Sequence, residues 1–185
     1  CTIEKVVKLL KVAFKQAVKW EIVIRNPFEN SIIPKVEHKP RDIWTVEEIQ
    51  KALSHCTDGK LYIAINLSFA CSMRLGEIIG LTWDNVDISD QAIANDNASI
   101  YIKTQLERVP VKTLELLNNR GVQKVFPPVI PKSTTRLVLK EPKTKSSIRR
   151  VWLPKTVAYI LKEWKTKQEN LKELLQDEYQ DFNLV

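Results

Sequence analysis

Near the amino terminus, apolar residues recur every three or four positions, a spacing that predicts an amphipathic helix from Ile3 to about Trp20. Lysines occupy its other faces, and Lys8, Lys15 and Lys19 are the candidates there for contact with a nucleic-acid backbone. A basic helix face of this kind either follows such a backbone or simply remains in solvent, and solvent is the commoner case.

Prolines mark the end of this helix and the stretch after it. We expect Asn26-Pro27 to end the helix, because the residue before a proline is pushed out of the helical region, and Pro34 and Pro40 to keep the following chain extended. Thr45-Val46-Glu47-Glu48 has the form of a capping box, which predicts that a new helix and a second domain start there. The first helix starts without a cap, so we expect its own domain to begin upstream. The pattern therefore predicts the truncated end of a helical domain, a linker and the front of a second domain, at residues 1–30, 31–42 and 43–185.

The second domain combines helical spacing with shorter stretches of period two. Helices are expected at Leu61 to Cys71, where the segment is apolar enough to be buried throughout, at Val111 to Asn119, and from Pro154 to about Asp181. Strands are expected at Ser99 to Glu107, Thr135 to Lys140 and Arg149 to Leu153, the last two paired as a β-hairpin. The fold class predicted is mainly α with a small antiparallel β-sheet (α+β).

Composition narrows the class of protein further. The 185 residues contain no run of about 18 apolar residues such as a membrane span needs, so we expect a soluble, cytoplasmic protein with no membrane partner. Its cysteines, Cys1, Cys56 and Cys71, are widely spaced, and its histidines are His38 and His55. We therefore expect neither a disulfide nor a metal site.

Positive charge is concentrated in one segment, from Ile130 to Lys155. Eight basic residues there face one acid, Glu141, an excess equal to the net charge of +7 of the whole chain. The eight are Lys132, Arg136, Lys140, Lys143, Lys145, Arg149, Arg150 and Lys155. Such a cluster is expected of a segment that faces phosphates, although a solvated basic hairpin would have the same composition.

Arg74 lies between two apolar helical stretches, where a charge is costly without an anionic partner. Glu77, three residues later, is one partner, because side chains at this spacing lie on the same helix face. A phosphate group could engage the remaining donors of the guanidinium. On these residues alone an ordinary internal ion pair is the better explanation.

The string around Arg74 resembles the first arginine box of the tyrosine recombinases, a family of DNA integrases. It matches at Met73, Arg74, Glu77, Ile78, Leu81, Trp83, Val86 and Asp87. It departs at Cys71-Ser72, where the family usually has Thr-Gly, and at Asn85, where aspartate is common. Because glycine permits a positive φ that serine disfavours, we expect the turn before Arg74 to be built differently here.

A second string, Glu141 to Pro154, resembles the β-hairpin whose lysine reaches the cleavage site in this family. The match assigns Lys143 as the catalytic lysine, with Lys145 as the alternative. The front of the chain is similar to the end of the family's core-binding domain, so the resemblance spans nearly the whole chain. The insert at 111–132 has no counterpart that we can assign.

The resemblance implies a DNA strand transferase in which a tyrosine attacks a phosphodiester and forms a 3′-phosphotyrosyl link, without a cofactor. Arg74 would stabilise the transition-state charge, Lys143 would protonate the leaving oxygen, and Glu77 would orient Arg74. Double-stranded DNA would be the partner, contacted also by Arg149 and Arg150. The parent protein would form a tetramer on DNA, and the present chain would be a monomer.

In this family the later motifs, H-x-x-R, a histidine or tryptophan, and the nucleophilic tyrosine, follow the helix predicted to end near Asp181, and no match lies there. The tyrosines present lie elsewhere in the pattern: Tyr62, Tyr101, Tyr159 and Tyr179. We therefore expect these 185 residues alone not to cleave DNA. Two other classes fit the charge distribution: a non-enzymatic DNA-binding module, and a helical interaction protein whose basic surface is incidental.

Overall fold

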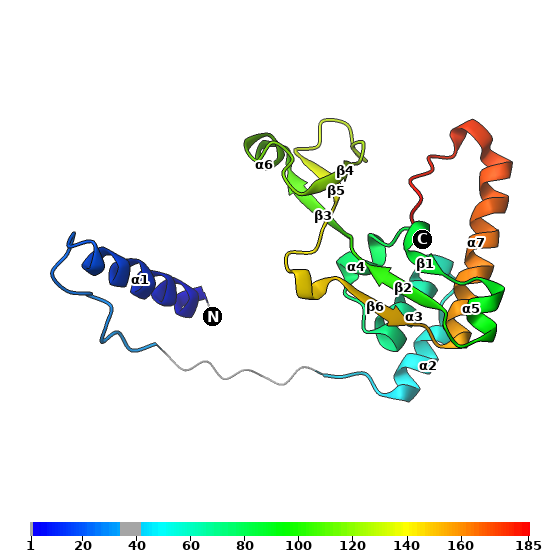
Figure 1. The fold of residues 1–185 in the computed structure, drawn as a ribbon, viewed down its shortest axis with the longest axis horizontal. Coiled ribbons are helices and arrows are strands. Elements are labelled where there is room, and N and C mark those ends of the chain that lie inside the picture. Colours follow the sequence, from blue (N-terminus) through cyan, green and yellow to red (C-terminus); the bar gives the residue numbers. More distant parts are fainter. Residues whose placement is uncertain (1, 34–41) are drawn as a thin grey trace. The chain divides into compact units, whose positions relative to one another are not determined.

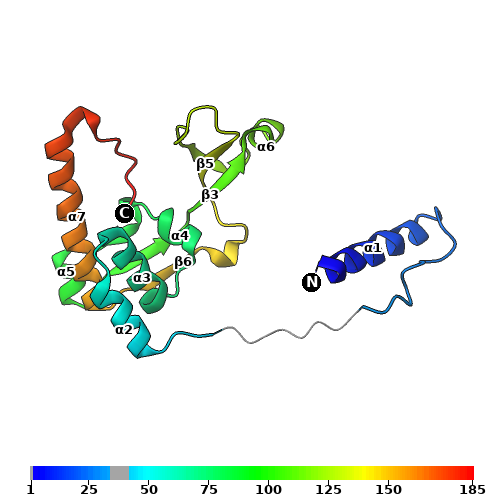
Figure 2. The same ribbon diagram turned by 180° about the vertical axis from the view of Figure 1, so that it is seen from behind.

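The computed structural model describes residues 2–33 and 42–185, which form two compact units, Cys1–Thr45 and Val46–Val185 (Figures 1 and 2). Most of the predicted linker, at 34–41, lies outside the described residues. The fold class is α+β as predicted, with small antiparallel sheets among the helices.

Helix α1, Thr2–Lys19, dominates the first unit and ends earlier than its predicted terminator. Glu21 adopts a left-handed φ of 59°, and the Ile22 N–H donates to the Ala17 carbonyl at 3.0 Å, which closes the last turn. The prediction that Asn26-Pro27 ends the helix is therefore wrong, because a left-handed residue had already ended it.

Asn26 instead folds the following segment back along α1. Its side-chain amide donates to the Lys11 carbonyl at 3.1 Å, and the Phe28 ring lies 5.2 Å from the Phe14 ring. The Lys11 ammonium in turn donates to the Ser31 carbonyl at 3.3 Å. These contacts give the unit a small packing centre of its own.

The second unit contains the predicted helices with shifted ends, and a helix at Asp90–Ala94 that was not predicted. The helices are α2 (Val46–His55), α3 (Gly59–Cys71), α4 (Leu75–Ile79), α5 (Asp90–Ala94), α6 (Val111–Leu116) and α7 (Lys155–Leu175). The Asp58 carboxylate caps α3 by accepting from the amides of Lys60 and Leu61 at 2.8 and 3.2 Å. The predicted extension of α7 to Asp181 is wrong, since Gln176, with φ 44°, ends the helix.

Within the described residues, six strands form two antiparallel three-stranded sheets. One sheet has the order β1-β2-β6 and the other has the order β3-β5-β4. The first contains β1 (Val86–Asp87), β2 (Ser99–Ile102) and β6 (Arg149–Trp152), and the second contains β3 (Gln105–Pro110), β4 (Val122–Val125) and β5 (Thr135–Lys140). Short 3-10 helices occur at Trp83–Asn85, Lys145–Ser147 and Gln176–Glu178.

Two strand predictions are wrong for one shared reason. The expected strand at 99–107 is two strands, and β5 and β6 are not a hairpin, because β5 pairs with β3 and β4 whereas β6 pairs with β2. The ladder breaks at Thr104, whose buried hydroxyl donates to the Gly80 carbonyl at 2.8 Å. The β2–β6 pairing ends at Ile102↔Arg149, and the β3–β5 pairing begins at Gln105↔Lys140. The loop at 141–148 therefore leaves the strands at the junction between the two sheets.

The main core lies between α3, α7 and the inner face of the β1-β2-β6 sheet (Figure 1). Leu67, Ile100 and Leu161 are fully buried there. Helix α3 was expected to be buried throughout, but only one face is, and Leu61 and Phe69 are about half exposed. The prediction failed because the outer face of α3 is also apolar. Hydrophobic content alone does not reveal which face of a helix another element covers.

Gly80 allows α4 to approach the start of β3 closely. A Cβ at Gly80 would lie 2.7 Å from the carbonyl carbon and 2.9 Å from the Cα of Gln105, and closer still to the Leu106 amide nitrogen. All these atoms are backbone and cannot rotate away. The contact therefore fixes the distance between the arginine box and the break in the ladder.

Substitution of Gly80 by alanine is expected to lower the free energy of unfolding by about 1–3 kcal/mol, because the methyl group overpacks against backbone. The matched control is Gly121→Ala, where the glycine has φ 76° but no atom within 4 Å of the added carbon. The control should lose about 1 kcal/mol, from backbone strain alone. Urea unfolding followed by circular dichroism measures both, and a Gly80→Ala loss no larger than that of the control would contradict the close approach.

Candidate functional site

The turn before Arg74 places a serine in a conformation that glycine adopts freely. Helix α3 ends at Cys71, and Ser72 follows with φ 50° and ψ 37°, in the left-handed region. The Ser72 N–H donates to the Leu67 carbonyl, which closes the helix end. The expectation that serine would avoid a positive φ in this turn is therefore wrong, and Arg74 follows as the extended N-cap residue of α4.

Glu77 is the buried centre of the site, with 3% of its surface exposed. Its Oε2 accepts from the Arg74 backbone N–H at 3.0 Å, and its Oε1 accepts from Arg74 Nη1 at 2.9 Å. The predicted Arg74–Glu77 pair is therefore present, and the carboxylate also caps α4.

Arg149, at the start of β6, binds the same carboxylate from across the unit. Its Nη1 donates to Glu77 Oε1 at 3.0 Å and its Nη2 to Oε2 at 2.9 Å, a two-bonded fork. Nη1 also donates to the Ser147 carbonyl at 3.2 Å, and Nη2 makes a longer contact of 3.5 Å with the Ser72 carbonyl. One guanidinium thus joins the arginine box to the loop that precedes β6.

Burial alone would raise the pKa of Glu77, but hydrogen bonds from Arg149 and Arg74 outweigh burial and lower this pKa to about 2. The same bond to Glu77 raises the pKa of Arg149. The carboxylate is consequently ionised at every physiological pH, and Arg149 keeps its charge beside it.

Arg74 differs from Arg149 in how much of its side chain faces solvent. The Arg74 side chain is 72% exposed and that of Arg149 is 31% exposed. Glu77 holds one end of the Arg74 fork, so the remaining donors point outward with a restricted orientation. This arrangement suits a group that receives an anion from solution.

Lys143 lies exposed in the loop between β5 and β6, and among the described side chains no hydrogen bond or ion pair holds its ammonium. Lys145 begins the 3-10 helix Lys145–Ser147. The Thr144 hydroxyl, 2.9 Å from the Ser147 hydroxyl, links the two ends of this turn. The structure therefore brings Glu77, Arg74 and Arg149 together and leaves Lys143 on a neighbouring loop.

The remaining predicted DNA contacts are exposed. Arg150 lies 3.4 Å from the Ser99 hydroxyl and its guanidinium lies 5.7 Å from the centre of the Trp152 ring. On α1, Lys8 pairs with Glu4 at 2.6 Å, and Lys15 and Lys19 are exposed.

Sequence reasoning missed the connection between Arg149 and Glu77. Residues two apart in a strand share a face, and Val151 packs against the core, so Arg149 points inward while Arg150 points outward. This alternation was a usable signal, although it could not name Glu77 as the partner.

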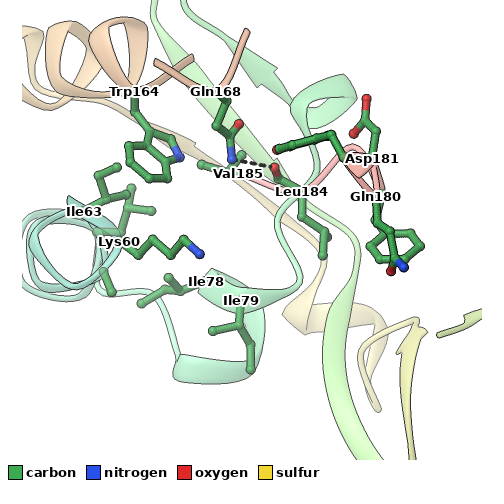
Figure 3. A pocket seen from close by; sticks show the side chains of 14 residues that line it. Lys60, Ile63, Ile78, Ile79, Trp164, Gln168, Gln180, Asp181, Leu184 and Val185 are labelled. Carbon is green, nitrogen blue, oxygen red and sulfur yellow. Dashed lines mark hydrogen bonds between the residues drawn. The ribbon is translucent and has the colours of Figure 1, made fainter. Parts of the chain in front are cut away.

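An apolar pocket of about 310 Å³ lies between α3, α4, α7 and the carboxy-terminal segment (Figure 3). Ile63, Ile78 and Trp164 line it, and the Gln168 amide donates to the Leu184 carbonyl at 3.2 Å beside it. Within the described residues no group of three metal-ligating side chains occurs, and no helix is long and apolar enough to cross a bilayer. Lys60 and Asp181 are the charged residues that line this pocket, and Asp181 pairs with Lys172, so Glu77 with its two arginines is the candidate site.

Fold and site together define an α+β domain that presents an anchored arginine at its surface, and comparisons with known proteins narrow this class. No family model matches the chain. The ICEBs1 integrase of Bacillus subtilis (strain 168) is 27% identical over 172 residues, covering 92% of this chain and 38% of the relative. A XerC-like tyrosine recombinase of Caldanaerobacter subterraneus subsp. tengcongensis is 25% identical over 178 residues, covering 92% of this chain and 40% of the relative. The chain thus spans about two fifths of the length of these curated relatives.

Solved structures of the Tn1549 transposon integrase share the fold. A complex with a circular intermediate DNA matches with a TM-score of 0.64 at 20% identity, over 89% of this chain and 45% of that chain. A complex with transposon right end DNA matches with a TM-score of 0.63 at 23% identity, over 88% of this chain and 44% of that chain. The chain is therefore similar in sequence to tyrosine recombinases and integrases, as its arginine box predicts, and it shares the fold of the Tn1549 integrase.

The depressed pKa of Glu77 gives a testable dependence of stability on pH. A carboxyl whose folded pKa is about 2, against an ordinary value of 4.5, stabilises the fold fully above pH 4.5 and loses this contribution as pH falls towards 2. We expect the stability difference between the parent chain and Glu77→Gln to shrink by about 3 kcal/mol over this window.

Urea unfolding at several pH values between 7 and 2.5 measures this difference. The control is Glu107→Gln, which removes a partly exposed carboxylate paired with Lys140 and so reports the effect of losing a surface carboxylate. A difference between parent and Glu77→Gln that stays constant down to pH 2.5 would show that the carboxylate is not held by its arginines.

Proposed function

We propose that this chain supplies the front part of the active site of a site-specific DNA recombinase, which cuts and rejoins DNA through a 3′-phosphotyrosyl intermediate. The observation that carries the proposal is the exposed Arg74 fork, oriented by a buried, ionised Glu77. The curated relatives named as an integrase and a tyrosine recombinase support it, as do the Tn1549 integrase structures, which contain DNA.

Arg74 is assigned to the scissile phosphate. A phosphodiester under attack gains negative charge in its pentacoordinate transition state, and planar N–H donors held in place stabilise that charge. Glu77 fixes the guanidinium through Nη1, so the free donors need not reorganise when the charge develops. Arg74 therefore acts on the transition state, with Glu77 positioning it.

Lys143 is assigned as the general acid. Cleavage releases a 5′-oxygen that needs a proton, and an ammonium on an exposed loop can approach it once DNA is bound. Lys145 remains the alternative donor, two residues further along the same loop. The attacking tyrosine and the second arginine motif are assigned to residues outside this chain.

Contacts to the DNA backbone are assigned to the exposed lysines Lys8, Lys15 and Lys19 and to Arg150. The first unit, on this proposal, is the end of a core-binding domain that holds the DNA, and the second unit is the front of the catalytic domain. A tetramer of the complete protein on two DNA sites would carry out strand exchange.

In the complete protein, Arg74→Lys is expected to lower the rate of DNA cleavage by about 100-fold or more, because a point charge replaces a fork. Lys143→Ala should also lower the cleavage rate by at least about 100-fold. Lys145→Ala should leave the cleavage rate near that of the parent, and a loss in this variant instead would assign the acid to Lys145. Cleavage of a nicked substrate in single turnover measures the rates, and gel-shift titration should show affinity for the site largely retained.

A substrate with a 5′-bridging sulfur separates the roles of Arg74 and Lys143. A thiolate leaves without a proton, so this substrate should restore cleavage by Lys143→Ala and not by Arg74→Lys. Equal rescue of both variants, or of neither, would contradict the assignment of Lys143 as the acid.

The 185-residue chain by itself is expected to form no covalent complex with a nicked DNA substrate, because none of its tyrosines is assigned as the nucleophile. Denaturing gels of the chain incubated with end-labelled nicked DNA would show such a complex as a slow band. A band that appears, and disappears on substitution of one tyrosine, would overturn the assignment of the nucleophile to another part of the protein.

A further inference from the structure

We propose that Arg149 is a positioning residue, which locks Glu77 and ties the loop carrying Lys143 to the arginine box. The inference rests on the function proposed above and goes beyond it by giving Arg149 a role other than contact with DNA. Its basis is the set of bonds that one guanidinium makes to three separate segments of the second unit.

The first segment is the arginine box itself. Both oxygens of Glu77 accept from Arg149, at 3.0 and 2.9 Å, and both also accept from Arg74, through its side chain and its backbone N–H. With four donors on two oxygens, the carboxylate has a single orientation. Because Arg74 reaches the same Oε1 as Arg149, any rotation of Glu77 would move the outward fork of Arg74 as well.

The second and third segments flank the predicted reacting groups. Arg149 donates to the carbonyl of Ser147, at the end of the loop that carries Lys143, and it contacts the carbonyl of Ser72, two residues before Arg74. The strand β6 begins at Arg149 itself, so its backbone is fixed by pairing with Ile102. Arg149 thus connects a rigid strand to both segments that bear the assigned catalytic side chains.

A direct phosphate contact is the competing role for Arg149. Both of its terminal nitrogens are already engaged by a carboxylate that is 3% exposed, and its own side chain is 31% exposed. A phosphate at these terminal nitrogens would have to displace one of the bonds and leave a buried charge partly unpaired, which is unfavourable. Arg74 and Arg150, both exposed, are better placed to receive phosphates.

Lysine cannot substitute for this arrangement. An ammonium is a compact point charge and cannot make two parallel bonds to a carboxylate in the plane of a fork. Arg149→Lys therefore keeps the charge while removing the geometry, which separates positioning from electrostatic attraction to DNA.

The first arm of the test needs no catalysis. In the 185-residue chain, carbon-13 NMR of the side-chain carboxyls should place the pKa of Glu77 near 2, and Arg149→Lys should raise it by about 1 unit or more, since the largest contribution lowering it is the bond from Arg149. Lys162→Gln, which breaks an exposed pair with Asp90 instead, should leave the Glu77 pKa unchanged. An unchanged Glu77 pKa in Arg149→Lys would overturn the inference.

The second arm uses the complete protein. Arg149→Lys should slow cleavage at saturating DNA by about 10-fold or more, while the dissociation constant for DNA and its dependence on salt stay within about 2-fold of the parent. Lys162→Gln should leave the cleavage rate within the same range. If Arg149 contacts a phosphate instead, Arg149→Gln should weaken binding and reduce the slope of log affinity against log salt by about one contact, and this result would reject positioning.

The two arms distinguish the possible failures. In one outcome the parent protein and Arg149→Lys cleave DNA equally well, whereas Arg74→Lys does not. The proposed function then stands, and the role proposed for Arg149 is wrong. If Arg74→Lys cleaves like the parent, the proposed function fails, whereas the NMR arm still reports whether Arg149 holds Glu77.

Discussion

A buried carboxylate shared by two guanidinium groups is the interaction on which the rest of the site depends. Glu77 is ionised with 3% of its surface exposed, which is tolerable only because Arg74 and Arg149 supply four hydrogen bonds to its two oxygens. The two arginines have different surroundings, because Arg74 faces solvent whereas Arg149 faces the core. The same charge balance that permits burial therefore also orients an exposed fork.

The interrupted antiparallel ladder explains how residues distant in the sequence reach this carboxylate. Pairing in the first sheet stops at Ile102 and Arg149, and pairing in the second starts at Gln105 and Lys140. The break releases the loop at 141–148 beside the arginine box. Gly80, whose carbonyl accepts from Thr104, holds α4 against this junction. A substitution that moved the junction would therefore disturb the loop and the fork together.

Local patterns predicted individual elements well because the forces behind them act within a few residues. The strand at Thr135–Lys140 and the helices α1 and α2 follow directly from spacing and capping. The terminations were harder to predict. Glu21 and Gln176 end helices with positive φ angles that their residue types do not indicate, and Ser72 adopts a left-handed conformation that glycine adopts more freely. The exposed half of α3 was missed because an apolar pattern does not state which face another element covers.

Sequence by itself revealed the resemblance to tyrosine recombinases, through Arg74 with its flanking string, and the concentration of charge in 130–155. It also placed Arg74 and Glu77 together by their spacing of three residues, which in the structure joins the N-cap residue of α4 to the third residue of that helix. Only the tertiary structure decided that β5 and β6 belong to different sheets, and that Arg149 lies against Glu77, 72 positions away in the chain. Strand pairing and burial of a charge depend on register between distant segments, and no local spacing of residues contains that register.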